Sequence, residues 1–351
     1  MSLRFDRVQK LISQKIAEGI FPCAVAEIGD SHGPLWRYAE GLRQIKPEPV
    51  PVNEDTIFDM ASVTKIFSTT MVALTMIEEG ILSPFDHLGL FWEGLPEKSA
   101  RMTVQQLLTH SSGLPGGKSI VGLPKDTIAE AILKSDDVLY GKGSYEADTQ
   151  VSYACLGFIV LGELVAKLGG KPLDVLAQER VFGPLGMKNT GFAPKGDNIA
   201  ATSLTEPVKG VVNDYNARYL GRPVGNAGVF STAEDCGKFA RMLLHGGEPI
   251  VSAPTIAAAN QNYTPFSGHR RGLGFYRFAN DAQPACQICS PTAFGHSGWT
   301  GTSVMADPEL DMYVVLLTNR TCQEHFEMDA IWRARRYINN AAVAAINKNK
   351  E

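Results

Sequence analysis

The chain has 351 residues, of which 44% are hydrophobic and 20% charged, and its formal net charge is −4. This composition is typical of globular proteins, and the length favours two lobes over a single core. The small negative charge gives no reason to expect nucleic acid or an anionic membrane as a partner. No stretch approaches the roughly 20 apolar residues of a membrane-spanning helix. We expect a small-molecule substrate, and the oligomeric state stays open.

The N-terminal segment, residues 1–19, places apolar residues at helical spacing between charged ones. This pattern predicts an amphipathic helix of the mature fold, because a signal peptide would need an apolar central region. We therefore expect a cytoplasmic protein if residue 1 is near the native start, and a periplasmic or extracellular one if a signal was removed. Two apolar runs at 23–28 and 35–39 surround a turn cluster and predict a β-hairpin.

The next periodic segment, residues 62–79, predicts a helix that ends at Gly80, a typical C-terminal glycine. Ser62-Val63-Thr64-Lys65 opens it, and residues three apart share one helical face, so the Ser62 hydroxyl and the Lys65 amine should lie side by side. An alcohol is a poor nucleophile unless a neighbouring group takes its proton. The pair is therefore a candidate nucleophile and base, although this spacing also arises by chance.

Helical patterns continue through the middle of the chain, and strand patterns return near its end. The predicted helices cover residues 103–110, 126–134, 156–168, 173–181, 232–245 and 326–346, and the predicted strands 294–299, 301–306 and 312–318. The helices at 103 and 232 both begin with the pattern of a capping box.

Strands near both ends with helices between them predict a mixed α/β fold of the α+β type. It would have a central antiparallel sheet flanked by helices, plus an inserted all-helical lobe. The discontinuous sheet domain would comprise residues 1–60 together with 210–351, and the helical domain residues 61–209. The active site would lie in the cleft between them.

Tyr153 is the second candidate, just before the helix predicted at 156–168. A phenol has an ordinary pKa of about 10, so it acts as a base only where positive charge stabilises the phenolate. Lys65 is one source of that charge. Conversely, a phenolate or another cation would hold Lys65 neutral enough to act as the base itself. A purely structural role for the ring, packed at a helix start, stays open.

The third candidate is the segment His296-Ser297-Gly298-Trp299. Small residues on a strand let a substrate lie against the backbone. The backbone amides of Ser62 and Trp299 are candidates for an oxyanion hole. His296 would polarise the tyrosine, bind a substrate carboxylate or serve only the structure. An electrostatic role for it predicts that activity changes between pH 6 and 7.5.

Cys286 and Cys289 have CxxC spacing, which occurs in metal and redox sites. Neither a second CxxC nor a pair of histidines accompanies them, so a structural zinc site lacks ligands. We interpret them as reduced thiols without a special role, and we expect no metal site.

Together these segments resemble the serine β-lactamase and penicillin-binding protein superfamily, in the branch of class C β-lactamases, D,D-peptidases and family VIII esterases. The resemblance covers nearly the whole chain in the family's order. Ser62-Val63-Thr64-Lys65 stands at Ser-x-x-Lys, Tyr153-Ala154-Cys155 at Tyr-x-Asn, and His296-Ser297-Gly298 at Lys-Thr-Gly or His-x-Gly, with further similar stretches at 107–115, 184–187 and 228–235.

The resemblance implies a β-lactamase-like fold and a mechanism without a metal or organic cofactor. Ser62 would attack a carbonyl group while Lys65 and Tyr153 shuttle its proton to the leaving group. The amides of Ser62 and Trp299 would hold the oxyanion, and water would hydrolyse the acyl-enzyme. Catalytic roles thus fall on Ser62, Lys65, Tyr153 and His296, and substrate-binding roles on Cys155, Ser297 and Gly298.

Three departures from the family pattern bear on the substrate. Cys155 replaces an asparagine that binds the substrate's amide side chain and contacts the lysine, and a thiol is a weak hydrogen-bonding group. His296 replaces the lysine of class C β-lactamases, and histidine is largely neutral near pH 7. Gly116-Gly117 stands where those enzymes offer a glutamine to the side chain.

These departures favour an ester or small amide over a β-lactam, and so an esterase-like serine hydrolase. A β-lactamase or D,D-carboxypeptidase is the nearest alternative. An alternative of another class is a non-catalytic protein that binds β-lactams or peptidoglycan fragments. Residues 118–125 and 213–226 are predicted to form walls of the cleft.

Overall fold

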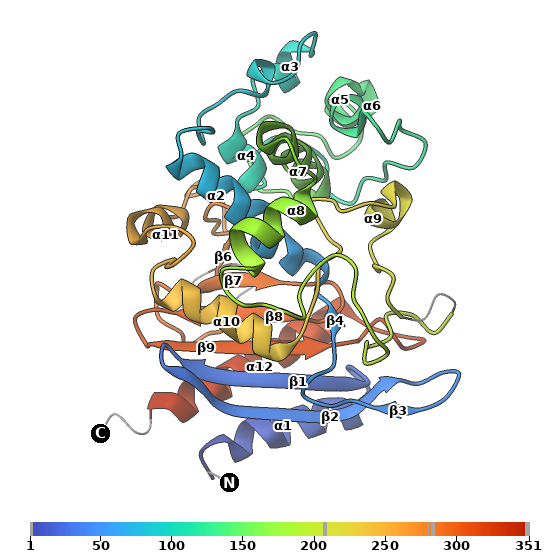
Figure 1. Ribbon diagram of the computed structural model, residues 1–351, viewed down its shortest axis with the longest axis vertical. Coiled ribbons are helices and arrows are strands. Elements are labelled where there is room, and N and C mark those ends of the chain that lie inside the picture. The colour runs from blue at the N-terminus through green and yellow to red at the C-terminus, as the bar shows by residue number, and fades with distance from the viewer. Residues whose placement is uncertain (1–2, 206–208, 280, 282–284, 348–351) are drawn as a thin grey trace.

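The sheet is assembled from both ends of the chain. The structure is a computed structural model that describes residues 3–205, 209–279, 281 and 285–347. Within these residues, seven antiparallel strands pair in the order β3-β2-β1-β9-β8-β7-β6 (Figure 1). The strands are β1 Cys23–Asp30, β2 Gly33–Gln44, β3 Val50–Pro51, β6 Tyr276–Arg277, β7 Phe294–Ser297, β8 Ser303–Asp307 and β9 Met312–Thr318. The two hairpins predicted from the sequence are confirmed, and the predicted α+β fold with them.

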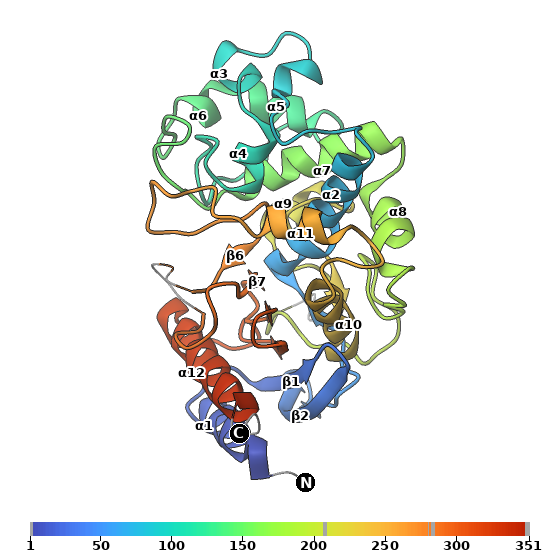
Figure 2. The ribbon, with the colours of Figure 1, turned by 90° about the vertical axis from the view of Figure 1, so that its left-hand side faces the viewer.

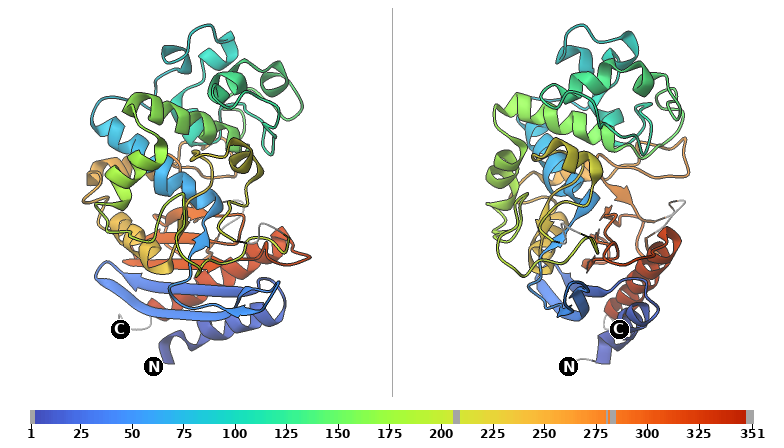
Figure 3. Two further views of the ribbon diagram at one scale, coloured as in Figure 1. Left: turned by 45° about the vertical axis from the view of Figure 1, so that its right-hand side comes forward. Right: turned by 90° about the vertical axis from the view of Figure 1, so that its right-hand side faces the viewer.

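The helices lie on both faces of the sheet and beyond its β6 edge (Figures 1 and 2). They are α1 Asp6–Ala17, α2 Met71–Glu78, α3 Glu97–Ala100, α4 Val104–Leu108, α5 Ile128–Lys134, α6 Asp136–Leu139, α7 Cys155–Gly169, α8 Leu173–Ala177, α9 Tyr215–Leu220, α10 Ala233–Leu244, α11 Ala253–Ala259 and α12 Met328–Asn347. Helices α1 and α12 cover one face, α10 covers the other, and α2 to α9 gather at the far end, as the turned views of Figure 3 also show.

Side chains of the central strands alternate between the two faces of the sheet and so form two hydrophobic cores. In β1, Val25 packs on the α10 side while Ala24 and Ala26 pack on the side of α1 and α12. Strand β9 repeats the pattern, because Val315 and Val314 enter opposite cores. Successive strand residues point to opposite faces, so a sheet covered on both sides needs apolar residues at every position. The proposed domain boundaries at residues 60 and 210 stay a prediction.

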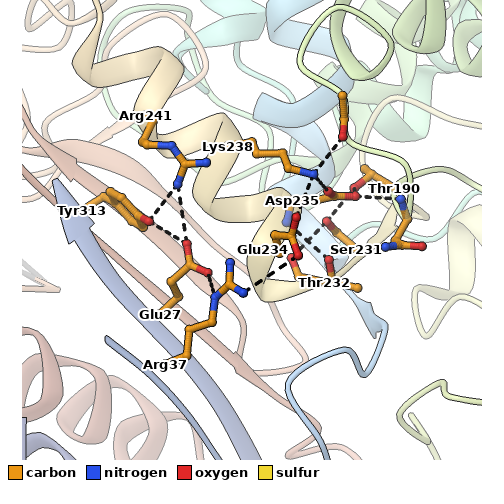
Figure 4. A network of polar contacts seen from close by, with 12 residues as sticks. Glu27, Arg37, Thr190, Ser231, Thr232, Glu234, Asp235, Lys238, Arg241 and Tyr313 are labelled. Atoms are coloured by element: carbon orange, nitrogen blue, oxygen red, sulfur yellow. Dashed lines mark hydrogen bonds and ion pairs between the residues drawn. The ribbon is translucent and has the colours of Figure 1, made fainter. Parts of the chain in front are cut away.

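Helix α10 is fixed to the sheet by a buried polar network (Figure 4). Glu27 of β1 is fully buried, forms an ion pair with Arg37 of β2 and accepts a hydrogen bond of 2.6 Å from the Tyr313 hydroxyl. Arg241 of α10 donates to the same tyrosine oxygen at 3.0 Å. A side chain at Gly237 of α10 would collide with the Glu27 carboxylate, so glycine lets the helix approach this closely.

The segment predicted as one helix at 62–79 departs from regular α geometry. It begins with a 3₁₀ turn, Ala61–Val63, continues as a π-helix, Lys65–Thr70, and becomes α-helical only in α2. Such π segments often occur at functional sites. The predicted end is confirmed, because Gly80 has a φ of 69°.

The two predicted capping boxes have different outcomes. Thr103 accepts from the Gln106 amide while the Gln106 side chain accepts from the Thr103 amide, so this box is complete. Thr232 accepts from the Asp235 amide, but the Asp235 carboxylate turns to Thr190 and Lys238 instead of closing the box. The prediction of a second capping box is therefore confirmed for the bond to the Thr232 side chain and wrong for the return bond from the Asp235 side chain.

Candidate functional site

Ser62 lies on a strained turn between a short strand pair and the π-helix. Strand β4, Phe58–Asp59, pairs with β5, Phe230–Ser231, and leads directly into this turn. Ala61 has a φ of 46°, a conformation that costs energy for a residue with a Cβ atom. The fully buried Asp59 carboxylate holds the turn by accepting hydrogen bonds from the amides of Ala61 at 2.8 Å and Asn213 at 2.7 Å.

Lys65 lies beside Ser62, as the spacing predicts. Its side chain is fully buried, and Nζ is 3.2 Å from Ser62 Oγ. Nζ also donates to the Asn226 carbonyl at 2.9 Å and contacts Cys155 Sγ at 3.6 Å. The ring of Tyr153 is 4.9 Å from Nζ, measured to its centroid. The amine is therefore held by a carbonyl oxygen and an aromatic face, with the nucleophile candidate within reach.

Tyr153 is held in place by His110, a residue to which the sequence pattern assigned no role. The amides on either side of Tyr153 both bond to this histidine: Ser152 donates to its carbonyl at 3.0 Å and Ala154 to its Nδ1 at 3.2 Å. The two rings lie 4.4 Å apart between centroids. Since Nδ1 accepts a hydrogen bond, the neutral His110 ring carries its proton on Nε2.

Burial raises the pKa of Tyr153 well above its ordinary value, although the Ser62 and Tyr276 hydroxyls and the Arg271 charge act in the opposite direction. This direction favours the neutral phenol in the free protein. Its hydroxyl has no hydrogen-bond partner among the described residues. A buried donor without a partner is unfavourable and is typical of groups poised for a substrate.

His296 is fully buried on β7, with its ring 4.2 Å from that of Tyr276 between centroids. Its Nδ1 contacts the Ser297 carbonyl at 2.8 Å. A carbonyl only accepts, so Nδ1 is the protonated nitrogen, and Nε2 is an acceptor without a hydrogen-bond partner among the described residues. Burial, together with the charges of Lys65 and Arg271, holds the pKa of His296 well below its ordinary value. The imidazole is thus neutral and unsuited to pairing with a substrate carboxylate.

The residues after β7 are tied to the turn that carries Ser62. The Thr300 hydroxyl donates to the Asp59 carbonyl at 2.7 Å, and the Thr302 hydroxyl donates to the Met60 carbonyl at 3.1 Å. A Cβ at Gly298 would collide with this same Met60 carbonyl, so only glycine fits there. Two candidate oxyanion donors, the amides of Ser62 and Trp299, are thereby carried by segments fixed to each other.

A cavity of about 390 Å³ opens at this junction, a size common for small-molecule sites. Of the predicted site residues, it brings together Ser62, Tyr153, Ser297, Gly298 and Trp299 in its wall. Lys65, Cys155 and His296 lie outside the lining. Cys155 contacts the lysine instead, so the structure does not support its predicted contact with substrate.

Several lining residues escaped the sequence reasoning. Arg271, Tyr276 and Arg335 contribute to the cavity wall. Arg271 and Tyr276 form an isolated β-bridge next to β7, and Arg335 enters from α12. Only the pairing of distant segments brings these side chains to the serine, so no local sequence pattern predicts them. Asn226 was not predicted either, because its backbone carbonyl contacts Lys65 and its side chain does not.

The two segments predicted as cleft walls, 118–125 and 213–226, lie against each other. Asn216 donates to the Lys118 carbonyl at 3.0 Å, and the Tyr219 hydroxyl donates to the Leu123 carbonyl at 2.8 Å. Among the described residues, neither segment lines the cavity at Ser62. Part of the second one lines a different cavity of about 1000 Å³. The second segment still reaches the candidate site, because the Asn226 carbonyl accepts from Lys65, and the role of both segments as cleft walls stays a prediction.

Neither CxxC cysteine is among the residues that line the cavity at Ser62. The Cys286 thiol contacts Asn340 Oδ1 at 3.3 Å, and the Cys289 thiol contacts the Cys286 carbonyl at 3.6 Å. Within the part of the chain that the structure describes, His, Cys, Asp and Glu side chains nowhere gather in threes with the arrangement of a metal site. None of the helices described combines the length and the apolar character needed to cross a membrane.

Comparison with known proteins agrees with this architecture. The sequence profile of the Beta-lactamase family matches residues 8–337. A "Putative D-alanyl-D-alanine carboxypeptidase" of Escherichia coli K12 is 27% identical, over 90% of this chain and 82% of that protein.

Two solved structures share the fold. EstCE1, a hydrolase with promiscuous acyltransferase activity, has a TM-score of 0.78 at 23% identity, over 97% of this chain and 98% of that chain. D-amino acid amidase from Ochrobactrum anthropi SV3 has a TM-score of 0.74 at 20% identity, over the full length of both chains.

Proposed function

Since the chain belongs to the β-lactamase family of hydrolases, we propose that it cleaves an ester or small amide through an acyl-enzyme on Ser62. The observation that carries the proposal is the distance of 3.2 Å between Lys65 Nζ and Ser62 Oγ, at the wall of a cavity. Side chains of these types at this separation form an activated nucleophile.

The proposed mechanism gives each group one task. Ser62 Oγ attacks the carbonyl carbon while its proton passes to the Lys65 amine, which the Asn226 carbonyl holds in position. The amides of Ser62 and Trp299 stabilise the oxyanion. When the tetrahedral intermediate collapses, the neutral Tyr153 hydroxyl gives its proton to the departing oxygen or nitrogen and regains one from Lys65. Water then attacks the Ser62 ester and releases the acid.

An esterase-like activity is favoured over efficient β-lactam hydrolysis. His296 is neutral, and Cys155 offers a thiol where an amide-recognising asparagine would stand. The E. coli relative, named a putative carboxypeptidase, supports a D,D-carboxypeptidase as the second candidate. A penicillin or peptidoglycan-fragment sensor without turnover is the third.

One experiment separates these candidates: intact-protein mass spectrometry after exposure to a fluorescent penicillin, a 4-nitrophenyl ester and a D-Ala-D-Ala peptide. We expect a transient acyl adduct from the ester, with turnover, and slower reaction with the penicillin. The Ser62→Ala variant should form no adduct. Ser68→Ala is the matched control, because Ser68 is buried in the same π-helix and its hydroxyl bonds only to the Thr64 carbonyl among described residues.

Other outcomes have distinct meanings. A permanent adduct without product would support the sensor, and preferred release of D-alanine would support the carboxypeptidase. Turnover that survives in Ser62→Ala would refute the proposed nucleophile.

A further inference from the structure

The turn after β7 carries the Trp299 amide, one of the two proposed oxyanion donors. Two backbone hydrogen bonds close this turn, from the Gly301 amide to the Gly298 carbonyl at 3.1 Å and from the Gly298 amide to the Thr302 carbonyl at 2.7 Å. The Trp299 amide itself bonds to no acceptor among the described residues, and Trp299 lines the cavity at Ser62. The donor is therefore available, and its usefulness depends on the direction in which it points.

Arg335 of α12 binds this turn through three of its carbonyl groups. One terminal nitrogen of the guanidinium donates to the carbonyls of Gly298 at 2.6 Å and Thr302 at 3.0 Å, and Nε donates to the Gly301 carbonyl at 3.3 Å. Arg335 is only 3% exposed, and among the described residues no carboxylate forms an ion pair with it. A cation buried without a counter-ion is unfavourable for stability. The turn therefore lies against a fixed and uncompensated positive charge.

One of these carbonyls belongs to the same peptide unit as the proposed donor. The Gly298–Trp299 bond is trans, so the Gly298 carbonyl and the Trp299 N–H lie in one plane and point in opposite directions. A guanidinium bonded to the carbonyl therefore fixes the direction of the N–H. It also polarises the peptide, because hydrogen bonds in series strengthen one another where the dielectric constant is low. Both effects favour negative charge in front of the N–H.

A second buried arginine holds the next peptide unit and helps to separate the two roles. Arg320 Nε donates to the Trp299 carbonyl at 2.5 Å, and this carbonyl shares its peptide unit with the Thr300 amide. Arg320 thus holds the turn in place without touching the peptide of the proposed donor. Arg335 is the arginine whose contact bears directly on the Trp299 N–H.

We infer that Arg335 is a positioning residue of the acyl transfer, which acts through the Gly298 carbonyl to aim and polarise the Trp299 amide toward the oxyanion. The inference rests on the proposed function, because the oxyanion forms only when Ser62 attacks a carbonyl group. It assigns part of the stabilisation of the transition state to a side chain from the C-terminal helix that does not touch the reacting atoms.

An ester and its thiono analogue test this. The two substrates, 4-nitrophenyl acetate and 4-nitrophenyl thionoacetate, release the same leaving group and differ only in having oxygen or sulfur at the carbonyl. Sulfur is a weak hydrogen-bond acceptor, so an oxyanion hole made of N–H groups favours the oxygen ester. The measured quantity is the oxygen preference: the ratio of kcat/KM for the ester over the thionoester, divided by the same ratio of rates with hydroxide ion in solution.

We expect a wild-type oxygen preference of about a hundredfold or more, and a value about tenfold lower in Arg335→Met. The loss should fall on kcat of the oxygen ester and leave KM nearly unchanged, because the interaction is made with the oxyanion and not with the bound ester. Arg335→Lys should keep an intermediate preference, since the charge remains while the planar guanidinium is lost. Arg333→Met is the matched control, because Arg333 is an exposed arginine of the same helix, and it should keep the wild-type preference.

A merely structural role for Arg335 would lower the turnover of both substrates equally. An oxygen preference that is unchanged in Arg335→Met therefore overturns the inference, whether or not activity falls. If Arg335→Met does not fold, Arg335→Lys decides, and a wild-type preference in that variant overturns the inference.

Failure of the proposed function gives a different result. Hydrolysis of both substrates would then be equal in wild type and Ser62→Ala. If turnover depends on Ser62 but wild type shows no oxygen preference, the proposed oxyanion hole and the role of Arg335 are both refuted, while the proposed nucleophile stands.

Discussion

The Lys65 side chain donates to the main-chain carbonyl of Asn226 at 2.9 Å, across 161 positions of sequence. This contact aims the amine at Ser62, since one donor is used by a fixed acceptor and the rest of the group faces the hydroxyl. Removing the amine removes both the proton acceptor and the group that carries the proton onward.

Lys65→Met should therefore lower kcat on an activated ester by about 10²–10⁴-fold, the usual contribution of a positioned base. The double variant with Ser62→Ala should be no worse than Ser62→Ala alone, because residues that act as a unit are not additive. Lys167→Met is the control, because Lys167 is an exposed lysine of α7 whose Nζ donates to the Phe91 carbonyl. Retention of most activity in Lys65→Met would contradict the proposed proton route.

The pH dependence of activity should not reflect His296. Its pKa is held well below the ordinary value, so the ring stays neutral throughout pH 6 to 7.5. We expect kcat/KM on a neutral ester to show no inflection from this residue, and His296→Gln to keep the shape of the profile in that window. An inflection in wild type that disappears in His296→Gln would show that the ring titrates there.

Asp59 should make stability fall as pH rises. Burial raises its pKa to about 6, against hydrogen bonds from the amides of Asn213 and Ala61 that act in the opposite direction. Between about pH 4 and 6 the folded state keeps a proton that the unfolded chain has lost, so its stabilising effect is present at low pH and lost through that interval. A shift of this size corresponds to about 3 kcal/mol.

Asp59→Asn should remove this component from the pH dependence of the free energy of unfolding, measured by urea titration at pH 4, 5, 6 and 7. Asp55→Asn is the control, because Asp55 is exposed and close in sequence. A pH dependence that is the same in Asp59→Asn and wild type would refute the assignment.

The network under α10 should matter for stability and not for chemistry. Glu27→Ala leaves Arg37 and Arg241 partly buried without their carboxylate, and breaking such a pair typically costs about 3–5 kcal/mol. We expect that loss in the free energy of unfolding, with kcat unchanged in the protein that remains folded. Glu18→Ala removes the surface pair with Lys15 and should cost much less, because solvent screens an exposed ion pair. Equal losses in the two variants would count against the network.

The sequence predicted what local periodicity controls. Spacing of three placed Lys65 beside Ser62, and the runs of apolar residues marked β1, β8 and β9. It missed what only pairing between distant segments creates. The contact of His110 with the segment around Tyr153 and the stacking of Arg271 on Tyr276 have no local pattern. The π-helix after Ser62 was also missed, because a single π turn inside a helical segment is too short to change its apolar pattern.

The central pairing of β1 with β9 has a consequence for synthesis on the ribosome. The β1–β2 hairpin emerges early, but the strand that covers its second edge ends at Thr318. Until most of the chain has been made, β1 therefore presents unpaired amides and carbonyls along a run of apolar residues. Such edges readily pair with other chains. Expression at lower temperature or with chaperones should raise the yield of this protein more than changes at its surface.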